Sequence, residues 1–226
     1  NFLNHIGNIS SRKATANPFT VFTYQDNKIW FGTIKGLFIF NPQTHVIDTI
    51  RELYQSMVHN TKLFKDYILI GTYGNGFYLH KNGRTVKMPL DKNQYLLNVH
   101  TFVYDKNGMM WMSTNRGLFK CRFSDLENYF NDTSQNVYYT FYDETDGILN
   151  TEFNGGCTSA SVILSNGFVS LPTMEGLVWF KPDDFKDVDD NTPIIVDDVF
   201  LHDKPVNTFN IHVESSVENM RIMFSS

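Results

Sequence analysis

Short apolar segments, each closed by a turn signal, recur along most of this chain. A pattern of apolar residues, a threonine, and then a glycine followed by further apolar residues occurs at 29–40, 68–79, 110–119 and 168–180. This glycine recurs after 40, 41 and 59 residues. Each copy predicts two antiparallel strands joined by a tight turn. Repeats of about 40 residues made of short strands are typical of a β-propeller, in which each repeat forms one four-stranded blade.

Another apolar segment precedes each copy and ends in residues that favour hairpin turns. Asp, Asn, Ser and Gly are frequent at 26–28, 105–108 and 165–167, and they tolerate the left-handed backbone of such turns. Large and small side chains alternate on one sheet face, which we expect to pack on the neighbouring blade. The tryptophans of the copies are assigned to this packing: Trp30, Trp111 and Trp179.

The connectivity of an up-and-down blade brings loops from several repeats to one rim. The turn between the second and third strands shares that rim with the connection to the next blade, and binding residues concentrate on such loops. Tyr73, Tyr95 or Phe153 is expected to stack on a sugar, while polar neighbours bind its hydroxyls. Alternatively, each of these residues is a solvated turn position or takes part in blade packing. The candidate ligand-binding residues are Lys35, Tyr73, Asn75, Tyr95, Asn115, Arg116, Glu152, Asn154 and Glu175.

Two segments depart from the repeat. Ser124 and Glu127 form a Ser-x-x-Glu capping box, which predicts a short helical turn that decorates the outer edge of a blade. The Asp-rich stretch 183–192 predicts a solvated linker; it resembles the start of a calcium loop, but the following Gly and the distal Glu are missing, so no metal site is predicted. Blades are thus expected over 1–182, and 193–226 predicts the first strands of a β-sandwich, too short to complete its core.

Composition narrows the classes of function. The chain has 226 residues, 42% of them hydrophobic and 15% aromatic, enough to bury a core of packed sheets. A net charge of −5 without a dense Lys/Arg cluster argues against a nucleic-acid partner. No apolar run reaches the ~18–20 residues that span a bilayer, and no cofactor motif is present. Cys121 and Cys157 are expected on strands that are not neighbours, which favours unpaired thiols over a disulfide.

Several of these motifs resemble a known family. The copies of Trp-x-Gly-Thr-x-x-Gly-Leu resemble the two-component regulator propeller (Reg_prop) repeat, and the segment 146–156, Asp-Gly-Ile-Leu-x-x-Glu-Phe-Asn-Gly-Gly, is similar to the last blade of that family. Residues 193–206 are similar to the opening of the triple-tyrosine (Y_Y_Y) sandwich domain that follows such propellers. Leu69, Ser113 and Leu171 depart from the repeat pattern.

The resemblance implies a periplasmic sensor region of a Bacteroides-type hybrid two-component histidine kinase, an inner-membrane protein. Such proteins bind oligosaccharides and control genes for polysaccharide utilisation, with the kinase and the transmembrane helix outside this chain. Family propellers have seven blades, so the four blades here would be the C-terminal part of one. A homodimer through the sandwich domain is expected, and no catalytic residue is.

Two other functions compete with this one. Propellers also include sialidases and other glycan-cleaving enzymes, but the segment 104–111 has the wrong spacing for a sialidase box, and the six Arg are scattered. No spacing here demonstrates the paired carboxylates of glycoside hydrolysis. A protein-binding scaffold of the Trp-Asp repeat class would carry Gly-His and Trp-Asp dipeptides, and these are absent.

Overall fold

The structure is a computed structural model that describes residues 21–155, 160–185, 195–202, 204–206 and 219–225. The chain divides into two compact units, Asn1–Phe185 and Lys186–Ser226, and each is described by itself.

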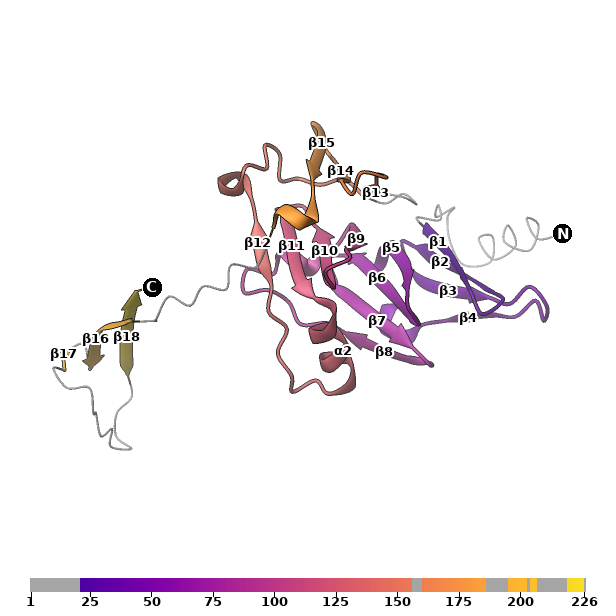
Figure 1. Ribbon diagram of the computed structural model, residues 1–226. Coiled ribbons are helices and arrows are strands. Elements are labelled where there is room, and N and C mark those ends of the chain that lie inside the picture. Colours follow the sequence, from indigo (N-terminus) through magenta and orange to yellow (C-terminus); the bar gives the residue numbers. More distant parts are fainter. Residues whose placement is uncertain (1–20, 156–159, 186–194, 203, 207–218, 226) are drawn as a thin grey trace. The chain divides into compact units, whose positions relative to one another are not determined.

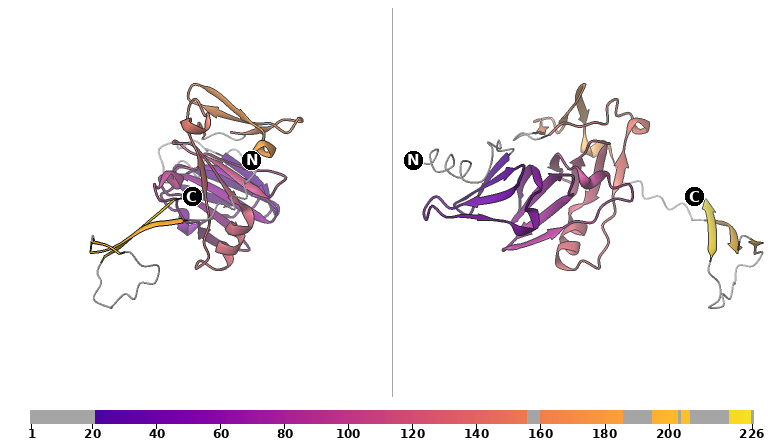
Figure 2. Two further views of the ribbon diagram at one scale, coloured as in Figure 1. Left: turned by 60° about the vertical axis from the view of Figure 1, so that its left-hand side comes forward. Right: turned by 180° about the vertical axis from the view of Figure 1, so that it is seen from behind.

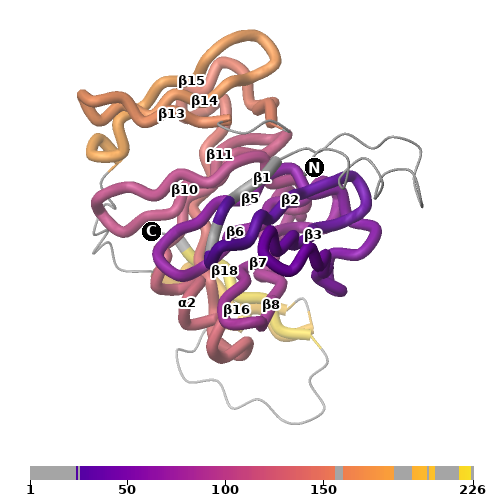
Figure 3. The backbone as a smooth tube through the Cα atoms, turned by 90° about the vertical axis from the view of Figure 1, so that its right-hand side faces the viewer, coloured from indigo at the N-terminus to yellow at the C-terminus, as the bar shows by residue number. Residues whose placement is uncertain are grey.

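The first unit contains four successive antiparallel sheets, each built from strands that are consecutive in the sequence (Figure 1). We call them blades 1 to 4. Figures 2 and 3 follow them in chain order, from the indigo strands of blade 1 to the orange strands of blade 4. Blade 1 comprises β1 (Val21–Gln25), β2 (Lys28–Thr33), β3 (Gly36–Phe40) and β4 (Ile47–Thr49); blade 2 comprises β5 (Met57–Phe64), β6 (Tyr67–Tyr73), β7 (Phe77–Lys81) and β8 (Arg84–Lys87). Blade 3 comprises β9 (Thr101–Tyr104), β10 (Met109–Ser113), β11 (Leu118–Arg122) and β12 (Thr140–Tyr142); blade 4 comprises β13 (Val162–Ile163), β14 (Val169–Thr173) and β15 (Gly176–Phe180).

The predicted all-β fold of propeller blades is confirmed, with one correction. Blades 1 to 3 have four strands, whereas blade 4 has three among the described residues. Short 3-10 helices lie in the connections: η1 (Arg51–Leu53), η2 (Tyr95–Leu97), η3 (Glu144–Asp146) and η4 (Pro182–Asp184).

The hairpin turns form where the sequence places Asn, Asp and Gly. Asp26 and Asn27 both have positive φ, at 51° and 58°, and they join β1 to β2 by a two-residue turn whose twist matches that of the strands. Asn82 and Gly83, with φ of 51° and 77°, do the same between β7 and β8. The backbone preferences of these turn residues therefore fix the register of the two hairpins.

Alternate side chains of a central strand bury against different neighbours, as expected for stacked blades. Ile68 and Ile70 of β6 pack with Trp30 of blade 1. Leu69, between them, packs with Phe102 of blade 3. The period of two along each strand thus joins consecutive blades through two separate apolar layers.

The outward face of blade 4 breaks this pattern. Leu37 and Leu118 follow the turn glycines of blades 1 and 3 and are 0% and 2% exposed, whereas the equivalent Leu177 is 64% exposed. Trp179, expected to pack between blades, is 63% exposed. That expectation was wrong for Trp179, because no described element covers this face.

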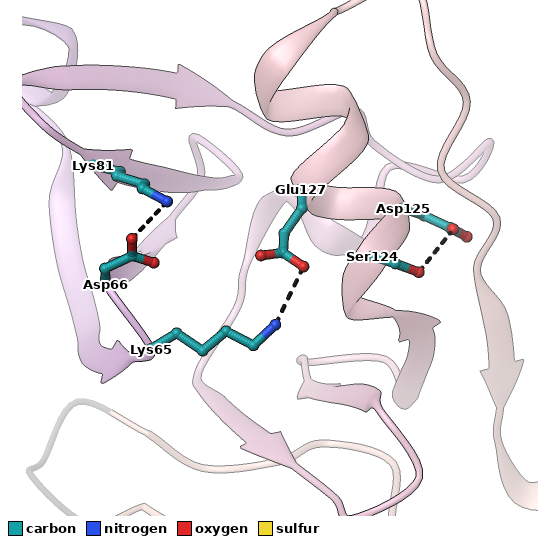
Figure 4. A network of polar contacts seen from close by, with 6 residues as sticks. All are labelled: Lys65, Asp66, Lys81, Ser124, Asp125 and Glu127. Carbon is teal, nitrogen blue, oxygen red and sulfur yellow. Dashed lines mark hydrogen bonds and ion pairs between the residues drawn. The ribbon is translucent and has the colours of Figure 1, made fainter.

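A helix inserted in blade 3 replaces the predicted helical turn. α2 (Phe123–Asn131) is capped by Arg122 without a side-chain hydrogen bond, so the proposed capping box is wrong: Ser124 already lies inside the helix. Figure 4 shows how Glu127 instead reaches Lys65 in the β5–β6 turn of blade 2, with Nζ and Oε2 3.3 Å apart. The buried face of α2 extends the apolar layer between blades 2 and 3 through Phe123, Leu126 and Phe130.

The boundary of the first unit lies a few residues beyond the predicted end of the blades. Phe185 packs against the rings of Trp111, Tyr142 and Phe180, and Asp183 pairs with Lys106 at 2.7 Å. The rest of the predicted linker, including its calcium-like pattern, lies outside the described residues.

The described residues of the second unit form a three-stranded antiparallel sheet in the order β17-β16-β18. Its strands are β16 (Ile195–Leu201), β17 (Lys204–Pro205) and β18 (Met220–Ser225). The pairing of β16 with β18 shifts register between Val196 and Asp198. β16 and β18 fall in the segments predicted as strands, whereas β17 was not predicted, and membership of a sandwich domain stays a prediction.

Two further expectations concern single features. Cys121 lies on β11, the third strand of blade 3, as a buried free thiol, while Cys157 lies outside the described residues. Within the described ranges, no helix is both long enough and apolar enough to cross a membrane.

Candidate functional site

The predicted rim exists, and backbone hydrogen bonds hold it together. The second turn of each of the first three blades bonds to the connection that follows the blade: Gln55 N donates to Lys35 O at 3.1 Å, Gly74 N to Leu97 O at 3.0 Å, and Phe153 N to Thr114 O at 3.1 Å. Turns and connections of consecutive blades therefore form one continuous edge. Side chains on these loops are fixed by the scaffold beneath them.

A β-bulge brings a histidine into this edge. β5 is the first strand of blade 2 and contacts the first strands of blades 1 and 3. Its register with β6 shifts between Val58 and Asn60, so that His59 is the extra residue. A bulge re-aims the side chain it carries and is common beside functional sites.

His59 belongs to a cluster of four side chains from blades 2 and 3. Its Nδ1 lies 3.1 Å from Nδ1 of His100, and its ring centroid lies 5.1 Å from that of Tyr73. His100 Nε2 bonds to Asn115 Oδ1, and Asn115 Nδ2 donates to the Tyr73 hydroxyl at 3.3 Å. We call these four residues the rim cluster: His59, Tyr73, His100 and Asn115.

The hydrogen bonds of the rim cluster define its protonation. Because Asn115 Oδ1 can only accept, His100 Nε2 carries a proton and donates it. The Nδ1 of neutral His100 is therefore an acceptor, and His59 Nδ1–H donates to it. Burial, followed by the charge of His100, lowers the pKa of His59 to about 4, so His59 is neutral near pH 7.

Glu152 and Gly155, on the connection to blade 4, adjoin the rim cluster. Burial lowers the pKa of His100, while its bond to Asn115 and the charge of Glu152 act in the opposite direction. A Cβ at position 155 would lie 2.6 Å from the Cβ of His100. The close packing of this connection on the imidazole thus requires glycine.

The structure brings together only part of the predicted site. Tyr73, 48% exposed, and Asn115 lie in the rim cluster. Asn75 is engaged nearby, since its Nδ2 donates to Ser56 Oγ at 2.7 Å and its Oδ1 accepts from Lys87 at 2.8 Å. The ring of Tyr95 lies 5.6 Å from that of Phe141, against the core.

The remaining candidates lie on the turns and connections of the same rim without joining the cluster. Their placement leaves their role in binding a prediction. Lys35 is half-buried, and the exposed members are Arg116, Glu152, Asn154 and Glu175. Phe153, offered as a stacking face, is only 2% exposed and packs between blades 3 and 4, so that expectation was wrong.

Two members of the rim cluster, His59 and His100, were not predicted from the sequence. His100 lies within a connection already predicted to reach the rim, so the position was available, although its ring was not singled out. His59 lies inside a strand. Only the bulge directs the His59 side chain to the cluster, and no residue of β5 indicates a bulge in the sequence.

The opposite rim contains grooves between blades. One of about 590 Å³ lies between blades 1 and 2 and is lined by the turn residues Asp26, Asp66 and Asn82 together with Trp30 and His80. Another of about 390 Å³ lies between blades 3 and 4. In the described part of the chain, no group of three or more His, Cys, Asp or Glu residues is arranged to hold a metal ion.

Comparison with known proteins agrees with this architecture. No family model matches the chain. It is 27% identical over 200 residues to histidine kinase P4 of Formosa agariphila, an alignment that covers 83% of this chain and 13% of that protein. The chain thus spans a small part of the curated relative that it matches.

Solved structures show the same fold. The extracellular domain of BT4673 from B. thetaiotaomicron, described as a putative one component system, superposes with a TM-score of 0.55 and 20% identity over 77% of this chain and 22% of that chain. A second structure of this domain, described as a putative hybrid two component system, gives a TM-score of 0.53 and 18% identity over 73% of this chain and 21% of that chain. The computationally designed Ika4 protein superposes with a TM-score of 0.50 and 9% identity over 75% of this chain and 94% of its own. At these identities, the likeness is one of fold alone.

Proposed function

We propose that this chain belongs to the periplasmic sensing region of a hybrid two-component histidine kinase and binds oligosaccharides without cleaving them, in order to control polysaccharide-utilisation genes. The relative named as a histidine kinase and the extracellular neighbour support the class of protein. The observation that carries ligand binding is the rim cluster, in which an exposed tyrosine ring is held beside convergent polar groups.

The chemistry of the rim cluster suits a sugar. The half-exposed ring of Tyr73 offers an apolar face for the C–H side of a pyranose. Its hydroxyl and the amide of Asn115 are already oriented by one hydrogen bond, so little side-chain entropy is lost on binding. Charged groups on the same rim, including Arg116 and Glu152, would bind ring hydroxyls or a uronate.

Melting temperatures measured against a panel of plant, host and microbial oligosaccharides test this proposal. A ligand at ~100 times its dissociation constant stabilises the folded state by about 2.7 kcal/mol, which gives a clear shift. Tyr73→Ala is expected to abolish the shift. Tyr138→Ala, which truncates a 74% exposed tyrosine between α2 and β12, is the matched control and is expected to retain it.

The recovered ligand decides between the classes of function. An oligosaccharide recovered intact supports a sensor, whereas cleaved products would indicate a glycan-cleaving propeller. No shift across the panel would contradict oligosaccharide binding and favour a protein partner.

Signalling is proposed to involve a homodimer of the parent protein through the second unit. A ligand can bias two arrangements of such a dimer only through a difference in affinity for them. Light scattering of the ectodomain with and without the ligand tests this, and a monomer under both conditions would contradict it.

A further inference from the structure

The two imidazoles of the rim cluster are arranged as a pair of metal ligands. We propose that His59 and His100 bind one divalent transition-metal ion, such as Zn²⁺, through their Nδ1 atoms. The site lies where blades 2 and 3 meet at the rim, and binding of the ion requires no oligosaccharide.

The distance between the two nitrogens fits a shared ion. Nδ1 of His59 and Nδ1 of His100 are 3.1 Å apart. With Zn–N bonds of ~2.0–2.1 Å, this separation corresponds to an N–Zn–N angle of about 100°, close to tetrahedral. The two nitrogens are therefore close enough to share one ion at ordinary bond lengths.

The far side of His100 has the partner that metal-binding histidines require. Its Nε2–H donates to Asn115 Oδ1, which fixes the tautomer and points the Nδ1 lone pair at His59. A ligating histidine characteristically donates its other N–H to a carbonyl or carboxylate oxygen. Asn115 is itself held by Tyr73, and Gly155 packs against His100, so the ring is positioned before any ion arrives.

Binding moves one proton within His59 and releases none from the protein. Without metal, His59 Nδ1–H donates to His100 Nδ1. The ion takes the Nδ1 lone pairs of both rings, and the His59 proton is transferred to Nε2 of the same ring, because a ligating histidine is a neutral imidazole with one N–H. His100 already carries its proton on Nε2, so its tautomer does not change.

The protein fills only part of the coordination sphere. Among the described residues, no third His, Cys, Asp or Glu completes the group. The remaining positions are open to water or to an exogenous oxygen ligand, as in zinc sites that are not purely structural.

Calorimetric titration of the whole protein with ZnCl₂ tests the proposal. One ion per chain is expected, with no net proton release near pH 7.5, measured in buffers of different ionisation enthalpy. His59→Gln and His100→Gln are each expected to weaken binding at least tenfold. His80→Gln is the control and should bind as wild type does, because His80 pairs with Thr85 and Trp30 rather than with another histidine.

Variants at Asn115 separate ligation from a general effect on folding. Asn115→Asp keeps an acceptor for His100 and is expected to retain or tighten Zn²⁺ binding, whereas Asn115→Leu removes it and should cost 10–100-fold. Visible absorption of Co²⁺ added to the wild-type protein provides a readout that needs no variant. The proposal is overturned if wild type takes up neither ion, or if the two histidine variants bind Zn²⁺ as tightly as wild type.

Discussion

Two equivalent tryptophans in blades 1 and 3 are expected to differ sharply in what their indole N–H contributes. Trp111 Nε1 donates to Asp105 Oδ2 at 2.7 Å, and Trp111 is 1% exposed. Trp30, 6% exposed, occupies the same place in blade 1, yet its buried Nε1 has no hydrogen-bond partner among the described residues. The two-residue turn at 26–27 is shorter than the turn at 105–108, and its carboxylate, Asp26, does not bond to Trp30 Nε1.

Replacing each tryptophan by phenylalanine isolates that hydrogen bond. Both changes leave a void of roughly 40 Å³, which costs about 1 kcal/mol at ~24 cal/mol per Å³. Trp111→Phe also removes a hydrogen bond to a buried carboxylate, worth about 1.5–3 kcal/mol. Trp30→Phe removes an unsatisfied donor and adds no such loss.

Equilibrium unfolding in guanidinium chloride measures the difference. Trp111→Phe is expected to lower the free energy of unfolding by about 2 kcal/mol more than Trp30→Phe does, with unchanged m-values for both. Equal losses would contradict this prediction, since they would mean that the Asp105 bond contributes nothing or that the Trp30 N–H is equally well bonded.

The remaining predictions concern the open face of blade 4, the pH dependence of stability and the packing of the rim. Leu177→Lys should change the free energy of unfolding by less than about 0.5 kcal/mol, whereas Leu118→Lys, at the buried equivalent position, should cost more than about 3 kcal/mol; similar losses would contradict the assignment of that face. The depressed pKa of His59, about 4 against 6.5 when unfolded, predicts full stability above pH 6.5 and a progressive loss as pH falls towards 4, because the unfolded chain takes up the proton first. His59→Gln should flatten that profile in unfolding experiments between pH 7.5 and 4, and an unchanged profile would assign the effect elsewhere. Gly155→Ala should lower the melting temperature, because its Cβ would lie 2.6 Å from His100, and an unchanged value would show that the connection can shift.

The blades could be predicted because their signals are local. Glycine and asparagine at fixed turn positions and an alternation of two along each strand act within a few residues, as at Asn82 and Gly83. Whether the apolar residues of this pattern are buried, by contrast, is decided by distant parts of the chain. Leu177 and Trp179 read like core residues, yet their exposure depends on whether another element covers the sheet face.

The candidate site, too, could be predicted only where the signals are local. Tyr73 and Asn115 could be assigned to the rim from connectivity, because second turns and connections must share an edge. The rim cluster as a group could not be predicted from the sequence, because it depends on the bulge at His59 and on the pairing of His59 with His100, 41 residues away. The predicted capping box at Ser124 was wrong for a related reason. The helix begins at Phe123, and contacts with Tyr67 and Phe64 bury the Phe123 side chain.

Hydrogen–deuterium exchange with and without an oligosaccharide that raises the melting temperature shows whether the ligand binds at the rim cluster. Slower exchange is expected in the rim segments 72–76, 95–100 and 113–117, which surround the rim cluster. Protection confined to 26–28, 65–67 and 82–84, which border the groove of about 590 Å³ on the opposite rim, would contradict it and place the ligand there instead.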